Sequence, residues 1–254
     1  MGERSGRLDH GGERLAWRAV DGTGPTAVWL GGFRSDMTGT KAEALADWAA
    51  RSGRAFLRFD YSGHGESSGA FADGTIGRWR DNALAVIDAC SEGPLVLVGS
   101  SMGGWIASLV ALARPERIVS MVLIAPAPDF TEALMWASFG DAQRAAVMEQ
   151  GAWDQRSEYG GTYPITRALI EDGRRWLLLP GPVPIGAPVR ILQGGADADV
   201  PWRHALAFAE ALKSDDVVFS LIKDGDHRLS RPQDIARLIA AVEEAAQVSN
   251  DSPL

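Results

Sequence analysis

Short apolar runs alternate with amphipathic stretches along most of this chain. The apolar runs are rich in β-branched residues and are bounded by Gly, Pro and polar positions, which is typical of buried strands. We expect strands at 26–30, 55–59, 95–98, 118–124, 189–192 and 217–222. The stretches between them predict helices from about 41 to 52 and from about 79 to 89. This alternation favours an α/β fold with a mostly parallel sheet and helices on both faces, in which ligands meet the carboxyl ends of the strands.

Two features modify this pattern. Residues 7–10 and 13–20 flank Gly11 and Gly12, which predicts a β-hairpin with a two-residue turn before the alternation begins. Between 124 and 189 the alternation stops. Helix-like stretches around 131–136, 142–149 and 165–178 lie there, separated by glycines and by the Pro-rich residues 180–184. Structureless loops of this length are rare in compact domains, so we expect an inserted helical cap at about 127–187 within a single domain spanning 1–254.

Composition excludes several classes of protein. The 254 residues can bury a large core, and the formal net charge of −8 argues against a nucleic acid partner. Cys90 is the only cysteine, so neither an internal disulfide nor a thiolate metal cluster is expected. No apolar stretch has the length of a membrane span, and the N-terminus lacks the apolar core of a secretory signal. We therefore expect a cytoplasmic protein.

A candidate nucleophile lies between a predicted strand and a predicted helix. Residues 99–103 read Gly-Ser-Ser-Met-Gly, after the apolar run 95–98 and before the helix-like stretch 105–110. A G-x-S-x-G segment in this position forms a sharp turn that projects its central serine from the sheet, and the glycines let neighbouring backbone pass closely. Ser101 is therefore the candidate nucleophile.

A serine needs a base that removes its proton, and only a histidine in the right place can serve. The chain has four histidines, and in the order nucleophile, acid, histidine the base follows the last strand. His227 alone has that position. His64 is expected to support a turn, and His204 to lie near the start of a helix.

The acid that orients the histidine should follow the preceding strand. Residues 193–201 read Gln-Gly-Gly-Ala-Asp-Ala-Asp-Val-Pro and offer Asp197 and Asp199. Matching Val200 and Pro201 to an Asp-x-x-Val-Pro motif places the acid at Asp197. Asp199 is the alternative acid. If it is not the acid, we expect it to cap a helix or to be solvated.

Hydrolysis also requires N–H donors for the developing oxyanion. One donor is expected to be the backbone N–H of Met102, and the other to come from the loop after the strand 26–30. We assign the second donor to Phe33, with Gly32 as the alternative. The glycines at 31 and 32 match no phosphate-binding motif, and the sequence offers no His, Cys and carboxylate cluster at ligand spacing, so no cofactor and no metal are expected.

Several stretches together resemble one family. They are Gly-Phe-Arg-Ser-Asp-Met-Thr-Gly-Thr-Lys-Ala at 32–42, Arg-Phe-Asp-Tyr-Ser-Gly at 58–63, Gly-Ser-Ser-Met-Gly-Gly-Trp at 99–105, Val-Pro-Trp at 200–202 and Asp-His-Arg at 226–228. The chain is similar to the α/β-hydrolase (abhydrolase) superfamily, and within it to the branch of mitochondrial palmitoyl-protein thioesterases and mycophenolic acid acyl-glucuronide esterases. The resemblance implies an α/β-hydrolase fold and a serine hydrolase of thioesters and activated esters, with Ser101, Asp197 and His227 as its triad.

Two departures limit what the resemblance implies. Gln193 stands where the family motif usually has histidine, a position outside the triad, so we expect catalysis to survive. No Arg-rich, acid-poor leader precedes the hairpin, so mitochondrial import is not expected.

The predicted function is hydrolysis of a small-molecule ester or acylated substrate through an acyl-enzyme intermediate. A serine peptidase or amidase would use the same triad, and a non-catalytic ligand receptor could use the same fold. The predicted cap carries large apolar side chains, some of which are expected to line an acyl pocket. These side chains are Trp136, Trp153, Tyr159, Tyr163, Trp176 and Leu177 to Leu179.

Overall fold

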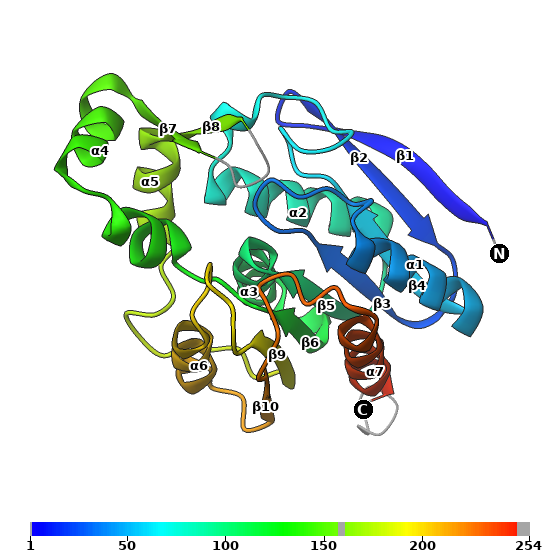
Figure 1. The fold of residues 1–254 in the computed structure, drawn as a ribbon. Coiled ribbons are helices and arrows are strands. Elements are labelled where there is room, and N and C mark those ends of the chain that lie inside the picture. Colours follow the sequence, from blue (N-terminus) through cyan, green and yellow to red (C-terminus); the bar gives the residue numbers. More distant parts are fainter. Residues whose placement is uncertain (1, 157–160, 248–254) are drawn as a thin grey trace.

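The computed structural model describes residues 2–156 and 161–247, which build an eight-stranded sheet (Figure 1). The spatial order of the strands is β1-β2-β4-β3-β5-β6-β9-β10. Their bounds are β1 Glu3–His10, β2 Glu13–Val20, β3 Thr23–Leu30, β4 Arg54–Phe59, β5 Leu95–Ser100, β6 Ile118–Ile124, β9 Val189–Gly194 and β10 Val217–Ile222. Each strand expected from the apolar runs is present, with ends shifted by a few residues at most.

The sheet is mostly parallel. β1 pairs antiparallel with β2, as expected for the N-terminal hairpin, and β2 also pairs antiparallel with β4. From β4 through β3, β5, β6 and β9 to β10 every neighbouring pair is parallel. β5 lies at the centre, and all six of its residues are buried. The carboxyl ends of the parallel strands therefore meet at one edge, where residues distant in sequence come together.

Helices cover both faces of the sheet (Figure 1). α1 (Thr40–Ser52) and α7 (Pro232–Gln247) pack on one face, where Leu45, Trp48 and Val242 join the core. α2 (Ile76–Cys90), α3 (Met102–Ala113) and α6 (Trp202–Ala211) pack on the other, and the core there includes Trp79 and Trp105. Within the described part of the chain, no helix has both the length and the apolar character needed to cross a membrane.

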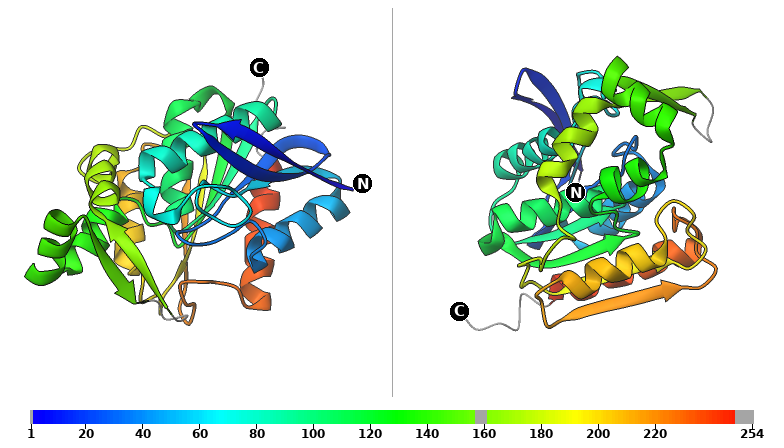
Figure 2. Two further views of the ribbon diagram at one scale, coloured as in Figure 1. Left: turned by 90° about the horizontal axis from the view of Figure 1, so that it is seen from above. Right: turned by 90° about the vertical axis from the view of Figure 1, so that its left-hand side faces the viewer.

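The segment between β6 and β9 stands apart from the sheet on one side (Figure 2). Its elements are a π-helical turn at Thr131–Trp136, α4 (Asp141–Ala145), a second π-helical turn at Ala146–Gln150, β7 (Ala152–Arg156), β8 (Thr162–Thr166), α5 (Arg167–Gly173) and a 3-10 turn at Arg174–Trp176. β7 and β8 form an antiparallel hairpin that was not expected from the sequence. Ile165, predicted to begin a helix, lies on β8 instead, because the hairpin gives its side chain a buried position beside Phe139 and Val147.

Asp129 joins the two ends of this segment. Its side chain is buried, and its two carboxylate oxygens accept the N–H groups of Leu178 and Leu179, each at 2.8 Å. The residue has a φ of 59°, a conformation that aspartate and asparagine tolerate better than most residues. Nearby, Glu132 and Arg174 form an exposed ion pair at 2.7 Å across the same two stretches. The ends of the segment are thus linked by one buried and one exposed contact.

We predict that Asp129→Asn lowers the free energy of unfolding by about 1 to 3 kcal/mol, because the amide offers a single acceptor oxygen to two N–H groups. Glu132→Gln is the matched control, and it should cost less than about 1 kcal/mol because the pair it breaks is exposed. Urea unfolding measures both. Equal losses in the two variants would contradict the role of the buried carboxylate.

Candidate active site

The residues predicted for catalysis all follow strands at the carboxyl edge of the sheet. Phe33 comes after β3, Ser101 after β5, Asp197 after β9 and His227 after β10. The structure brings Ser101, His227 and Asp197 into direct hydrogen-bond contact, although 126 residues separate Ser101 from His227. The parallel arrangement of the strands accounts for this convergence.

Ser101 lies in a strained turn between β5 and α3. Its φ of 55° and ψ of −119° are unusual for a residue with a side chain. The Ser101 N–H donates to the carbonyl of Ile124 at 2.9 Å, which holds the turn against β6. A β-carbon on Gly103 would lie 2.0 Å from the carbonyl oxygen of Leu30, and one on Gly99 would lie 2.4 Å from that of Gly103. Both glycines are therefore required for the close approach of backbone around the serine.

His227 contacts both other members of the predicted triad. Its Nδ1–H donates to Asp197 Oδ2 at 2.9 Å, and its Nε2 lies 3.1 Å from Ser101 Oγ. Nε2 is therefore placed where it could accept the serine proton. The imidazole keeps 23% of its side-chain surface exposed, whereas the Asp197 side chain is fully buried. This is the arrangement of a base oriented by a buried acid.

Asp197 is held by four N–H donors. Oδ1 accepts the N–H groups of Asp199 at 2.9 Å and Val200 at 2.8 Å. Oδ2 accepts His227 Nδ1–H and the Gln193 side-chain amide, the latter at 3.1 Å. The buried amide of Gln193, a residue expected to be outside the triad, contacts the carboxylate oxygen that accepts the histidine N–H. The sequence signal for this contact was that glutamine stands where the family motif usually has histidine.

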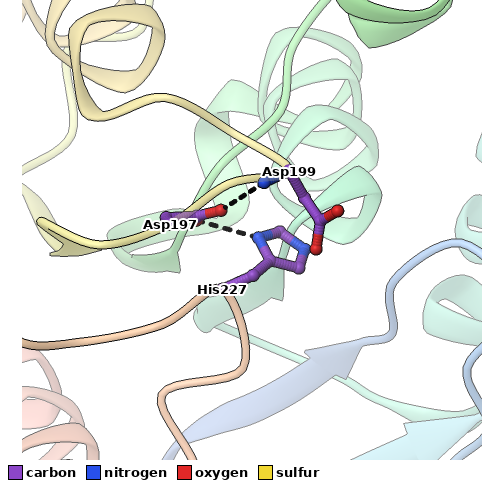
Figure 3. A group of neighbouring side chains, drawn as sticks. All are labelled: Asp197, Asp199 and His227. Atoms are coloured by element: carbon purple, nitrogen blue, oxygen red, sulfur yellow. Dashed lines mark hydrogen bonds and ion pairs between the residues drawn. The ribbon is translucent and has the colours of Figure 1, made fainter. Parts of the chain in front are cut away.

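Asp199 lies beside the imidazole ring, whereas Asp197 accepts its Nδ1–H (Figure 3). Asp197, Asp199 and His227 each have an atom that could ligate a metal ion, and these atoms lie within 4.8 Å of one another. This grouping was not expected from the sequence. Both ring nitrogens of His227 already contact protein partners, Asp197 and Ser101. The geometry therefore favours a proton-transfer role for the histidine over metal ligation.

The loop after β3 lies against the serine turn. A β-carbon on Gly32 would lie 3.5 Å from Ser101 Cβ. The Arg34 N–H donates to His64 Nε2 at 3.2 Å, and burial lowers the pKa of His64, which keeps this nitrogen available as an acceptor. His64 thus supports a turn, as predicted. The Phe33 N–H has no acceptor among the described residues, and the Met102 N–H is the first of α3, where an amide lacks a partner within the helix.

The Phe33 ring links this loop to the segment between β6 and β9. Its centroid lies 5.5 Å from that of Phe130 and 5.9 Å from that of Tyr163, both in edge-on arrangements. The Arg34 guanidinium lies over the Tyr163 ring at 4.1 Å. Of the large side chains expected in the cap, Tyr163 therefore contacts the loop that carries Phe33.

The other expected cap side chains have different surroundings. Trp136 and Trp153 pack in a small cluster around Phe139 and Val147, while Trp176, Leu178 and Leu179 pack against the main core. Arg144 and Arg174 lie over the Trp136 ring. Tyr159 is outside the described residues. These contacts assign packing roles to most of the set.

The known proteins that this chain resembles are hydrolases. A family model described as "Serine aminopeptidase, S33" matches residues 32–151. The mouse protein "Palmitoyl-protein thioesterase ABHD10, mitochondrial" is 38% identical over 232 residues, which cover 91% of this chain and 78% of the relative.

Solved structures agree with this relationship. A putative hydrolase from Agrobacterium vitis superposes with a TM-score of 0.91 at 47% identity, over 96% of this chain and 98% of that chain. Mouse alpha/beta hydrolase domain-containing protein 10 superposes with a TM-score of 0.89 at 34% identity, over 98% of this chain and all of that chain. The fold and most of the chain length are therefore shared with these proteins.

We predict that Asp197→Asn lowers kcat by about 10⁴-fold for the preferred substrate, because the amide no longer holds the imidazole in the tautomer that accepts the serine proton. Asp199→Asn should change kcat by less than about threefold, because Asp199 contributes its backbone N–H, which the substitution leaves in place. Steady-state kinetics of the two variants provide the measurement. The reverse ranking would transfer the role of acid to Asp199.

Proposed function

The chain belongs to the α/β-hydrolase superfamily, and we propose that it is a serine hydrolase that cleaves carboxylic esters and acyl thioesters through an acyl-enzyme intermediate. The observation that carries this proposal is the 3.1 Å contact between Ser101 Oγ and His227 Nε2, with Asp197 bonded to the other ring nitrogen. No cofactor is needed for such a reaction.

In the proposed mechanism the Ser101 hydroxyl attacks the acyl carbonyl while His227 Nε2 removes its proton. The resulting oxyanion is stabilised by the N–H groups of Met102 and Phe33, and the N-terminal end of α3 adds a favourable dipole. His227 then gives the proton to the departing alcohol or thiol. Water, activated by the same histidine, attacks the acyl-enzyme and releases the acid and free Ser101.

An ester or thioester substrate is supported by both the relatives and the site. The mouse relative is named as a palmitoyl-protein thioesterase. The Phe33 and Tyr163 side chains, which are partly exposed and in edge-on contact, offer apolar surface for an acyl chain at the proposed oxyanion loop. We further propose that residues 127–187 act as a cap within a single domain, because Phe130 and Tyr163 belong to this segment.

A peptidase is the alternative, and the description of the matching family model as a serine aminopeptidase favours it. An amide needs more assistance to its leaving group than an ester, and the triad geometry alone does not distinguish the two substrates. The substrate panel described below separates them.

The cytoplasmic location stays a prediction. The mouse relative carries the word mitochondrial in its name. Fractionation of cells that express the natural protein at its natural level decides between the two compartments.

We predict that the protein hydrolyses p-nitrophenyl esters and S-acyl thioesters with an optimum of acyl length. Each buried methylene contributes about 0.8 kcal/mol, so kcat/KM should rise roughly fourfold per methylene until the pocket is filled. Initial rates on an even-numbered series of acyl chains, with matched amides and an acyl glucuronide, provide the measurement.

Ser101→Ala is the control for this series, because it removes the proposed nucleophile and little else. All turnover should depend on Ser101. Amides cleaved as fast as the matched esters would favour the peptidase, and tight ligand binding without Ser101-dependent turnover would favour a receptor.

A further inference from the structure

Lys41 belongs to the Gly-Thr-Lys-Ala stretch of the sequence and has no part in the proposed chemistry. It lies in the first turn of α1 and is partly buried. Its Nζ donates to the carbonyl oxygen of Arg228 and lies 3.4 Å from Ser230 Oγ. Ser230 Oγ donates to the same carbonyl at 3.0 Å. Two donors therefore converge on the main chain directly after His227.

The chain that follows His227 needs such support. Leu229 is a buried, branched residue with a φ of 44°, a left-handed conformation that side chains of this kind rarely adopt. Its N–H donates to Asp226 Oδ1 at 2.9 Å. Strained backbone persists only where surrounding contacts hold it, and the Lys41 bond to Arg228 is one of those contacts.

The chain just before Lys41 is itself held by buried polar side chains. The Met37 N–H donates to Asp60 Oδ1 at 2.7 Å, and Arg58 Nη1 donates to the Met37 carbonyl at 2.9 Å. Both Asp60 and Arg58 are buried. The same stretch of chain continues back to the loop of Phe33. Lys41 thus connects the part of the chain that carries a proposed oxyanion donor to the part that carries the proposed base.

We propose that Lys41 is a positioning residue that holds the catalytic-histidine loop, residues 226–230, in the conformation that aligns His227 with Ser101. This inference rests on the proposed function. It assigns Lys41 no contact with the substrate, and its effect passes through the main chain of Arg228.

Because Lys41 acts as a charged donor, the proposed role makes the activity depend on pH. Burial and, to a smaller extent, the Arg228 cation lower the pKa of the Lys41 ammonium to about 8, against the opposing effect of Asp226 and Asp234. Arg237 lies near Lys41 and Asp234, where the three side chains line one small pocket. Proton loss above this pH replaces a charged donor with a weaker neutral one. Activity should therefore fall as pH rises through about 8.

The test compares three variants on a short p-nitrophenyl ester. Lys41→Met keeps the apolar stem but removes the donor, and we expect kcat to fall about 10- to 100-fold with KM little changed. Lys41→Arg restores a donor that stays charged, so it should recover most of kcat and move the alkaline fall to higher pH. Lys223→Met is the matched control, because it makes the same change at an exposed lysine next to the loop, and it should resemble the wild type.

Hydrogen exchange separates this inference from the proposed function, because it requires no turnover. The Leu229 amide should exchange faster in Lys41→Met than in the wild type or in Lys223→Met, with the thermal unfolding midpoint showing that each variant is folded. A Lys41→Met protein with wild-type kcat, pH profile and Leu229 exchange overturns the proposal. A wild type without any esterase or thioesterase activity contradicts the proposed function, and unchanged exchange at Leu229 would then contradict the role of Lys41 independently.

Discussion

The strained backbone at Ser101 is the constraint on which the site depends. A residue at φ 55° and ψ −119° costs on the order of 1 to 3 kcal/mol, which surrounding contacts must offset. The hydrogen bond to Ile124 and the tight packing of Gly103 under Leu30 supply those contacts. Because β3, β5 and β6 all contribute, the serine can project from the sheet only when the central strands are correctly paired.

The parallel sheet then brings the remaining groups to the serine. Each proposed functional residue follows a strand, so the strand order places Phe33 and Ser101 after the neighbouring strands β3 and β5, and the loops of Asp197 and His227 further along the same edge. Loops are mobile unless held, and here each is held from more than one direction. Asp197 has four N–H donors, while the loop after β10 is bonded both within itself and from α1. Rigid support of this kind is what proton transfer over one hydrogen bond requires.

Much of this arrangement could be predicted from the sequence, because its signals are local. The apolar runs located the strands, and the serine, acid and histidine were named from their order after those strands. The β7–β8 hairpin was missed because each of its strands has only five residues, too few for a clear alternating pattern. The contact of Lys41 with the Arg228 carbonyl was not predictable either, since it joins residues far apart in the sequence and no local pattern records it.

We propose that Ser101 is a nucleophile made reactive by its turn and by His227. Intact-protein mass spectrometry after exposure to a fluorophosphonate tests it most directly, followed by peptide mapping of the adduct. We expect one adduct per chain, located on Ser101 and formed far more slowly in His227→Ala. An adduct on another residue, or labelling that persists unchanged in Ser101→Ala, would contradict it.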